Sequence, residues 1–485
     1  MGQPRSLSVH IPVKDLSMNR TLSVKWALTL LIPFLVYFIP VPLDVVNPKM
    51  PLFLAFTVWA VVAWITEILP SVVVATVLTF LYALFVTTPQ NAFGAWLTFL
   101  PWISLGALIF AHAMECTGLG KRIALRGMLM MGGSFTATMF GLIVSGLVMA
   151  LIVPGAGMAR LVIYVTIGQG LVSALAVDPR SRLSSALMFG CFMAATTPCL
   201  AYLTAGETPL QMLSVVSAAC GRQMTWMEYF RLMTPFGILY CLGCTFLIFM
   251  VRGKERLPDE QHLRETLTRR LEELGPFKAS EAKTLLVMLI GLVGFVTESW
   301  HHMNGAYIFC CASMTCFLPG INLANQQTLR EINTPFLFFL CGCMSIGFVA
   351  NAMNVPQWIT GAIMPMMQNQ SVDVAIMLSY LLCVVLNFLL TPMACLASMG
   401  GALTAMATEL GLDPYALALT FQYGCDQHIF PYQTGYFLYL FTSGAVCLRY
   451  LMPALAVRIV AVAVAVAVAI PLLLVPYWKF IGYIQ

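Results

Sequence analysis

Charged side chains are scarce in this sequence. Of its 485 residues, 25 are Lys or Arg and 20 are Asp or Glu, so charged residues make up 9% of the chain. A soluble globular domain normally carries about a quarter. Hydrophobic residues make up 60% of the chain, and its mean hydropathy is +0.87. Because most of the surface must therefore face lipid, the composition excludes a soluble enzyme and predicts a polytopic membrane protein.

Several sequence signatures are absent as well. No C-x-x-C pair is followed by a second pair, so the 15 cysteines are interpreted as packing residues rather than as zinc ligands or disulfides. The P-loop, H-E-x-x-H and G-x-S-x-G patterns are missing, which leaves ATP-driven transport and hydrolysis without support. A basic surface for nucleic acid is also missing, and the polar N-terminus lacks the apolar core of a signal peptide. We expect no catalytic residue, no enzymatic activity and no cofactor other than a coupling Na⁺.

Long apolar runs predict an all-α fold. A membrane-spanning helix needs about 20 apolar residues, and about eleven runs qualify, at 26–42, 50–69, 71–88, 96–117, 184–217, 229–251, 284–300, 305–322, 334–353, 414–446 and 450–478. Two further apolar stretches, at about 130–175 and 372–411, are too long for one helix and carry helix breakers near their middle. Each of these two stretches predicts a re-entrant hairpin.

The polar segments divide the chain into four parts. We expect a cytoplasmic N-terminus at 1–25, a first repeat at 26–251, a linker at 252–283 and a second repeat at 284–485. Leucines four residues apart predict an amphipathic helix in the linker, with a polar face suited to solvent, the membrane surface or the other half. Most Lys and Arg fall at 1–25, at 121–126, at 180–182 and in the linker. This bias places the N-terminus in the cytoplasm and the C-terminus outside.

The two halves share an ordered pattern, which predicts an inverted repeat. In the first half, Ala-His-Ala-Met at 111–114 is followed by Pro154 and then Pro198. In the second half, Ala-Asn-Ala-Met at 350–353 is followed, at similar spacing, by Pro392 and Pro431.

Each of these four prolines interrupts an apolar stretch. Non-helical backbone survives in a membrane only where it lines a protein cavity, and the free ends of half-helices attract ions. The breaks therefore predict a substrate site made of Gly155, Ala156, Gly157, Thr196, Thr197, Pro198, Thr391, Pro392, Gln433 and Thr434.

Four motifs, in order along nearly the whole chain, carry a family resemblance. They are Trp64-Ile-Thr-Glu-Ile-Leu-Pro70, Leu119-Gly-Lys-Arg-Ile-Ala-Leu125, the linker run from Arg264 to Glu281, and Pro476-Tyr-Trp-Lys-Phe-Ile-Gly482. On these motifs the chain resembles the divalent anion/sodium symporter family. The resemblance implies a homodimer in which each protomer has a scaffold domain and a mobile transport domain, and elevator-type transport of di- or tricarboxylates or of sulfate-like anions. We expect the membrane to be a bacterial inner membrane.

The resemblance also bears on the coupling ion. The family's hairpin tips carry Ser-Asn-Thr motifs, whereas this chain has Gly155-Ala-Gly157 and Thr391-Pro-Met393. Glycine carbonyls and threonine hydroxyls still offer oxygen ligands, and Na⁺ sites are assigned to Gly155, Thr196, Thr391 and Thr434. Because the tips have lost amides and most hydroxyls, coupling to Na⁺, coupling to H⁺ and exchange of counter-anions all remain open.

Three ionisable residues lie in apolar surroundings. Ionisable groups at membrane depth indicate function by default. Asp426 and His428 precede the fourth break and are candidates for carrying a proton or for a structural pair. Arg160 follows the first tip, close to an arginine of the citrate-type exchangers, and either clamps a carboxylate or is paired internally.

The leading hypothesis is a secondary active transporter for a small organic anion. Two alternatives stand beside it. The first is a transport-inactive sensor or scaffold, which the altered tips favour. The second is an intramembrane enzyme, for which Asp426 and His428 are the candidate catalytic pair.

Overall fold

Every regular element that the structure describes is a helix. This computed structural model describes residues 20–40, 47–66, 68–132, 134–152, 157–257, 260–355, 358, 361, 370–387, 392–427 and 435–484. Within them, eight helices are long and apolar enough to cross a membrane, and five shorter helices are also apolar. The expected all-α polytopic fold is confirmed.

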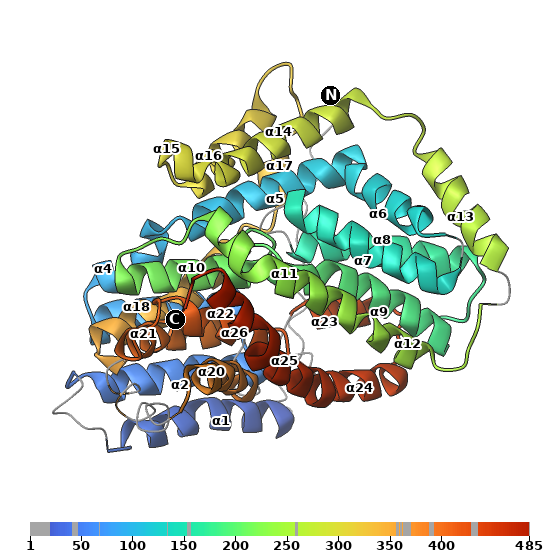
Figure 1. Cartoon of the computed structure of the whole chain (residues 1–485). Coiled ribbons are helices and arrows are strands. Elements are labelled where there is room, and N and C mark those ends of the chain that lie inside the picture. Colours follow the sequence, from blue (N-terminus) through green and yellow to red (C-terminus); the bar gives the residue numbers. More distant parts are fainter. Residues whose placement is uncertain are drawn as a thin grey trace, which may run out of the picture.

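The helices before the linker follow the expected spans closely (Figure 1). They are α1 (Arg20–Tyr37), α2 (Met50–Thr66), α3 (Ser71–Leu81) with the π-helical turn η1 (Tyr82–Val86), α4 (Pro89–Ala92), the 3₁₀ turn η2 (Gly94–Leu97), α5 (Leu100–Thr117), α6 (Leu119–Met130), α7 (Phe135–Ile152), α8 (Gly157–Ala174), α9 (Arg182–Thr196), the 3₁₀ turn η3 (Thr197–Leu200), α10 (Glu207–Cys220), α11 (Trp226–Cys244) and α12 (Phe246–Arg252).

The linker contains α13 (Glu260–Glu273), and the remaining helices follow it. They are α14 (Ala279–Val296), α15 (Glu298–His301), α16 (Gly305–Met314) with the 3₁₀ turn η4 (Thr315–Phe317), α17 (Thr328–Glu331), α18 (Pro335–Ala352), α20 (Val372–Leu386), α21 (Pro392–Glu409), α22 (Ala416–Gly424), α23 (Gly435–Thr442) and a last long span from α24 (Leu448–Val457) through η6 (Arg458–Val462), α25 (Ala463–Ala469) and η7 (Ile470–Leu474) to α26 (Val475–Phe480).

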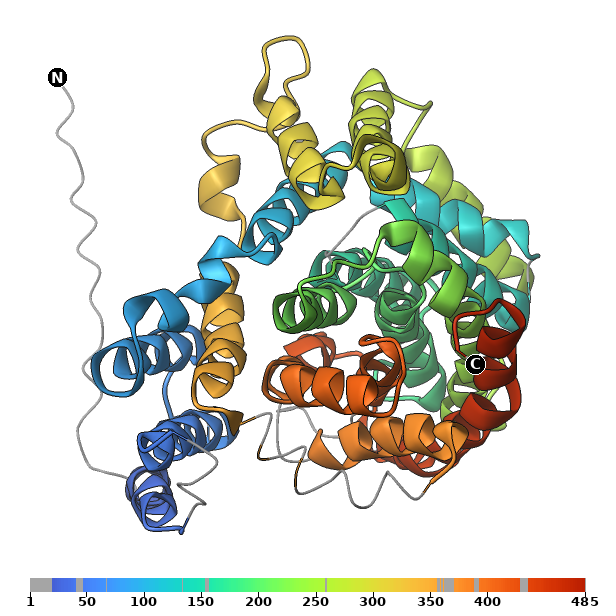
Figure 2. The ribbon, with the colours of Figure 1, turned by 60° about the vertical axis from the view of Figure 1, so that its left-hand side comes forward.

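The helices form an outer arm and a central bundle. In Figure 2, α1–α3, α18, α5 and α14–α17 run as an arc along one side of the molecule. The bundle beside this arc contains α7–α12 and α20–α26. A separate apolar cluster of α2, α3 and α18 side chains stabilises one end of the arm. Because α18 packs against both α3 and α21, it joins the arm to the bundle.

The two halves show the same order of packing. In the first half, α7 and α8 both pack against α9 and barely touch each other. In the second half, α20 and α21 stand in the same relation to α22. In addition, α10 of the first half packs closely against α21 of the second. Each broken helix is therefore held between the two arms of the hairpin that precedes it.

The break between α9 and α10 has a local cause in the sequence. Pro198 has no N–H to continue the α-helix. The hydroxyls of Thr196 and Thr197 bond back to the carbonyls of Phe192 (2.9 Å) and Met193 (2.7 Å), a pattern that bends helices. The chain therefore tightens into η3 before it restarts at Glu207.

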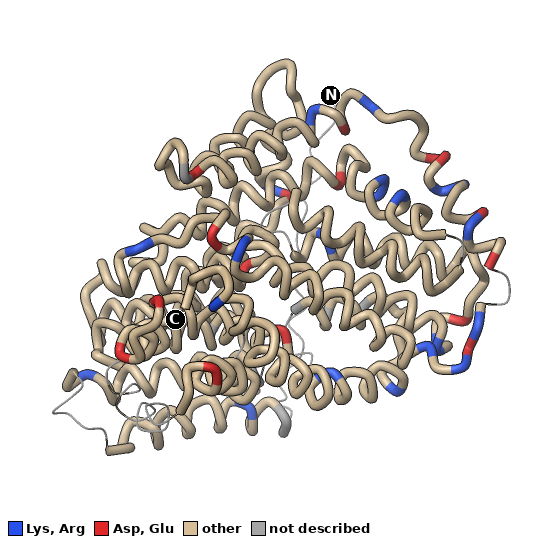
Figure 3. Tube along the Cα trace, in the orientation of Figure 1, with Lys and Arg blue, Asp and Glu red and all other residues tan. Residues whose placement is uncertain are grey.

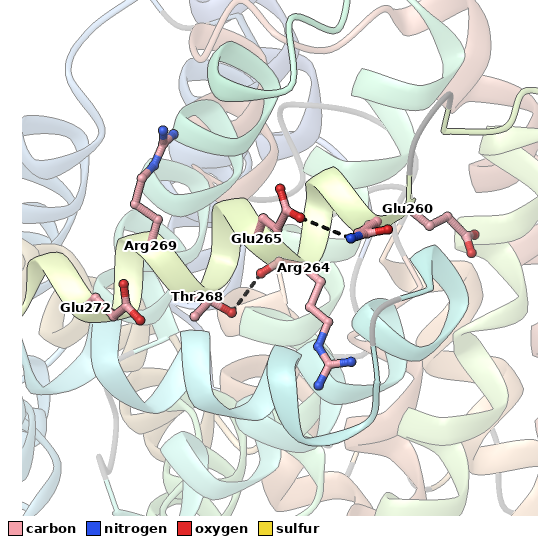
Figure 4. A pocket seen from close by; sticks show the side chains of 7 residues that line it. Glu260, Arg264, Glu265, Thr268, Arg269 and Glu272 are labelled. Atoms are coloured by element: carbon pink, nitrogen blue, oxygen red, sulfur yellow. Dashed lines mark hydrogen bonds between the residues drawn. The ribbon is translucent and has the colours of Figure 1, made fainter.

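The linker helix α13 packs on the first half. Its apolar face, with Leu263 and Leu267 fully buried, lies against α6 and α8, and Arg270 donates to the Gly170 carbonyl of α8 at 2.8 Å. The opposite face carries Glu260, Arg264, Glu265, Arg269 and Glu272 along an open hollow (Figure 4). The amphipathic helix expected in the linker is therefore present at Glu260–Glu273.

Replacing Gly146 with alanine is expected to destabilise the bundle by about 1–3 kcal/mol, the usual range for an overpacked core. A Cβ at Gly146 on α7 would overlap the backbone carbonyl of Ala194 on α9, and backbone cannot move aside as a flexible side chain can. Gly243 in α11 is the matched control, since a Cβ there meets nothing within 4 Å. Thermal unfolding of purified G146A and G243A should show a loss for the first only. Equal midpoints would contradict the close α7–α9 packing.

Candidate functional site

Helix N-termini from all four breaks gather in the bundle. The described part of the chain resumes at Gly157 (α8), Pro392 (α21) and Gly435 (α23), and α10 begins at Glu207 after the fully described break near Pro198. The predicted site residues that lie outside the described part of the chain are Gly155, Ala156, Thr391, His428, Gln433 and Thr434. The structure therefore locates Gly157, Arg160, Thr196, Thr197, Pro198, Pro392 and Asp426.

Glu207, the first residue of α10, connects three of these N-termini. Its Oε2 accepts a hydrogen bond from the Tyr436 hydroxyl of α23 at 2.6 Å. Its carboxylate also accepts from the backbone N–H of Gly157. A Cβ on Gly157 would lie 2.6 Å from the Tyr436 hydroxyl oxygen, so only glycine fits this approach without a shift. The first tip and both broken helices thus meet at one carboxylate.

Gln211 connects the fourth N-terminus, that of α21, to α10. It lies one turn after Glu207, on the same face of α10, and its side chain is fully buried. Its amide nitrogen donates to the Met393 carbonyl in the first turn of α21 at 2.8 Å. Its amide oxygen has no hydrogen-bond partner among the described residues.

Arg160 is fully buried behind this group of residues. Its guanidinium donates to the Ala205 carbonyl at 2.5 Å, to the Ala195 carbonyl at 3.4 Å and to the Cys199 sulfur at 3.1 Å. These contacts join α8 to both sides of the break before α10. Arg160 also interacts electrostatically with Glu207, so its positive charge lies at the back of the site.

The hydroxyls of Thr196 and Thr197 point back along α9, to the carbonyls already described. Beyond the break, the Leu200 carbonyl accepts hydrogen bonds from the Tyr229 and Tyr423 hydroxyls at 3.0 and 3.2 Å. This part of the break is therefore tied to α11 and α22 rather than to Glu207.

Asp426 lies at the end of α22 and belongs to a different group. It forms an ion pair with Arg458 of η6, and the Tyr240 hydroxyl donates to the same carboxylate oxygen at 2.6 Å. Arg458 is fully buried and Asp426 is 8% exposed. The Arg458 partner was not predicted from the sequence, and it ties the second broken helix to the last span.

The chemistry of the site follows from its donors. Helix N-termini present free N–H groups and a positive partial charge, which favour anions. Here they are joined by the Tyr436 hydroxyl and the Arg160 charge. Within the described residues, no group of three His, Cys, Asp or Glu side chains is placed to hold a metal ion. The site is suited to binding a carboxylate or a similar oxyanion.

Sequence reasoning missed Glu207, Gln211, Tyr436 and Arg458. Two of them had a signal, because Glu207 is the only acidic residue in the expected span 184–217 and Arg458 is the only charged residue in 450–478. An isolated charge in an apolar span indicates a buried partner or a function. Tyr436 and Gln211 carried no such signal, since their importance depends on which helices meet.

A protein-family model matches nearly the whole chain. The model describes the sodium:sulfate symporter transmembrane region, and residues 20–484 match it. The same residues contain all eleven expected spans and both expected hairpins.

Individual relatives are more distant. A membrane protein of Cupriavidus necator is 26% identical over 70% of this chain and 69% of its own length. The chloroplastic dicarboxylate transporter 1 of Arabidopsis thaliana is 22% identical over 79% of this chain and 70% of its own length. The citrate/succinate antiporter of Escherichia coli K12 is 25% identical over 41% of this chain and 40% of its own length.

One solved structure shows a related fold. It is the YdaH transporter of Alcanivorax borkumensis, described as having an unusual topology. The match has a TM-score of 0.50 at 15% sequence identity, and it covers 81% of this chain and 88% of that one.

Proposed function

This chain belongs to the sodium:sulfate symporter family, and from that premise we propose that it is a secondary active transporter for a small di- or tricarboxylate anion. The observation that carries the proposal is the meeting of helix N-termini from both halves around Glu207. Such N-termini bind carboxylates through backbone N–H groups. Relatives described as dicarboxylate and citrate/succinate transporters support this class of substrate.

The proposed transport cycle is of the elevator type. The central bundle would carry the site across the membrane, and the arm of α1–α3, α18, α5 and α14–α17 would remain fixed within a homodimer. The separate apolar cluster of α2, α3 and α18 supports the division into arm and bundle. Movement of the bundle past the arm would have to occur around α18, which packs against both.

We propose that the N-terminus lies in the cytoplasm, the C-terminus lies outside and the membrane is the bacterial inner membrane. Lys and Arg gather around α13 and the neighbouring loops, and they thin out through the apolar helices (Figure 3). An excess of Lys and Arg in short loops marks the cytoplasmic side.

Transport by purified protein in liposomes tests the proposal. Labelled succinate, citrate and sulfate would be supplied under a Na⁺ gradient, a pH gradient or internal counter-anion. We expect uptake of at least one anion above that of protein-free liposomes, and the gradient that drives it identifies the coupling. Folded protein that moves none of these anions under any gradient would favour the inactive sensor or scaffold instead.

A further inference from the structure

Glu207 is an unexpected residue for an anion site. Its carboxylate is itself an anion, and it accepts hydrogen bonds from Tyr436 and from the Gly157 N–H. These are the donors that a bound substrate carboxylate would need. The side chain is half-buried, and it stands at the first turn of α10, where the helix dipole also favours negative charge. In this conformation Glu207 occupies the place of an anion.

The charged groups that face Glu207 do not neutralise a second negative charge beside its carboxylate. Among the described residues, the titratable and charged groups around it are Tyr436 from α23, Arg160 from α8 and Cys199 from η3. Arg160 is the single cation among them, and it is shared with the Ala195 and Ala205 carbonyls.

Within the described part of the chain, the other elements that pack on α10 supply no further cation close to Glu207. Helix α21 runs alongside α10, with Met393 beside Gln211 and Gly400 beside Val215, so Glu409 lies at its far end. Tyr423 of α22 donates to the Leu200 carbonyl. Helix α5 carries His112 and Glu115. The Nε2 atom of His112 lies 3.7 Å from the Oε2 atom of Glu331.

Electrostatics then decides which species can bind. Two like charges a few ångströms apart repel strongly in the weakly polarisable interior of a protein. When two carboxylates share one site, one of them takes up a proton because both cannot ionise. A substrate carboxylate that reaches the Gly157 and Tyr436 donors is therefore favoured only when Glu207 is neutral.

We propose that Glu207 carries the coupling proton, so that each bound anion is accompanied by one H⁺ on the Glu207 carboxylate. This inference rests on the proposed transport function and specifies its coupling ion. On the side where the anion enters, the anion displaces the Glu207 carboxylate from its hydrogen-bond donors, and a proton from water bonds to a carboxylate oxygen of Glu207. On the other side the anion leaves, the proton returns to water, and Glu207 again binds Gly157 and Tyr436.

An independent observation supports a ligand at this position. The Gln211 amide oxygen is fully buried, lies one turn from Glu207 and has no partner among the described residues. Buried polar atoms are nearly always satisfied. A hydroxyl of the ligand, or the carboxylic acid group of a partly protonated ligand, is the kind of donor that would satisfy it.

Proton uptake by the purified wild-type protein is the first test. Adding succinate or sulfate to protein in lightly buffered detergent solution, with a pH indicator, should show about one proton taken up per anion bound. Sulfate stays fully ionised near neutral pH, so protonation of the anion itself cannot produce the signal. Anion binding without proton uptake would overturn the inference.

The second test compares Glu207→Gln with wild type in liposomes. Wild-type uptake should be driven by an inward proton gradient. In E207Q this drive should be lost and counterflow should no longer depend on pH, whatever the rate of counterflow. Glu207→Asp keeps a carboxylate and should restore part of the drive. Glu298→Gln is the matched control, because Glu298 is also half-buried in the first turn of a helix, but in the arm, and it should leave the drive unchanged.

The outcomes separate this inference from the proposed function. Wild-type protein that moves no anion, even in counterflow, contradicts the transporter proposal itself. Wild-type protein that transports anions but ignores the pH gradient, or E207Q that still accumulates them on it, contradicts only the role of Glu207.

Discussion

Asp426→Asn is expected to destabilise the folded protein by about 3–5 kcal/mol, the range for breaking a buried ion pair from one side. The substitution leaves the Arg458 guanidinium without its counter-ion. Arg458 is fully buried, and its Nε and Nη1 atoms have no hydrogen-bond partner among the described residues. Its charge is therefore balanced chiefly by Asp426. Asparagine keeps the shape of the side chain and removes only the charge.

A double-mutant cycle measures this effect. Thermal or denaturant unfolding in detergent would be compared for wild type, for Asp426→Leu, for Arg458→Met and for the pair of these two substitutions, with D426N as a further single variant. Each single variant should be strongly destabilised, whereas the apolar pair should recover much of the loss, since no charge then remains buried. Tyr240→Phe removes one hydrogen bond to Asp426 and should cost only about 1–3 kcal/mol.

The same cycle decides between two roles for Asp426. If the apolar pair is stable and still transports anions, the ion pair is structural, and Asp426 does not carry a coupling proton. If D426N is as stable as the wild type, the close pairing with Arg458 is wrong. Proton coupling through Asp426 and His428 then becomes the better hypothesis.

Much of the fold could be predicted because membrane helices are visible in the sequence as long apolar runs. The expected span at 334–353 is α18 (Pro335–Ala352), and the expected hairpin at 130–175 contains α7 and α8. Each is set by local apolar content and by helix breakers, which require no knowledge of distant contacts. The break at Pro198 was predictable for the same reason.

The site was harder to predict because its partners are far apart in the chain. Glu207 meets Tyr436 across 229 positions, and Gln211 meets Met393 across 182. Pattern reasoning located the breaks but not which side chains fill them. It considered Asp426 together with its sequence neighbour His428, which lies outside the described residues, and it did not find the ion pair that Asp426 forms with Arg458, 32 positions further on. Ion pairs inside a bundle follow helix packing, and one sequence does not reveal that packing.

Arg160→Gln is expected to reduce transport by about a hundredfold per folded molecule. The guanidinium donates to the Ala195 and Ala205 carbonyls on the two sides of the break. Hydrogen bonds to a charged group contribute about 1.5–3 kcal/mol, and each 1.4 kcal/mol is a factor of ten. Glutamine is shorter and neutral, so both the orientation of α10 and the charge behind Glu207 are lost.

Lysine at position 160 separates these two losses. It restores the positive charge but lacks the planar fork that reaches several acceptors at once, so R160K should recover only part of the rate. Counterflow of labelled succinate, normalised to the monodisperse fraction of protein, measures the effect. Arg222→Gln is the control, since Arg222 is largely exposed in its pairs with Asp413 and Glu228 and surface pairs contribute about 0–1 kcal/mol. If R160Q transports at the wild-type rate, the helix N-termini bind the anion without Arg160. Glu207 and the anion then lie close together without the positive charge of Arg160 between them.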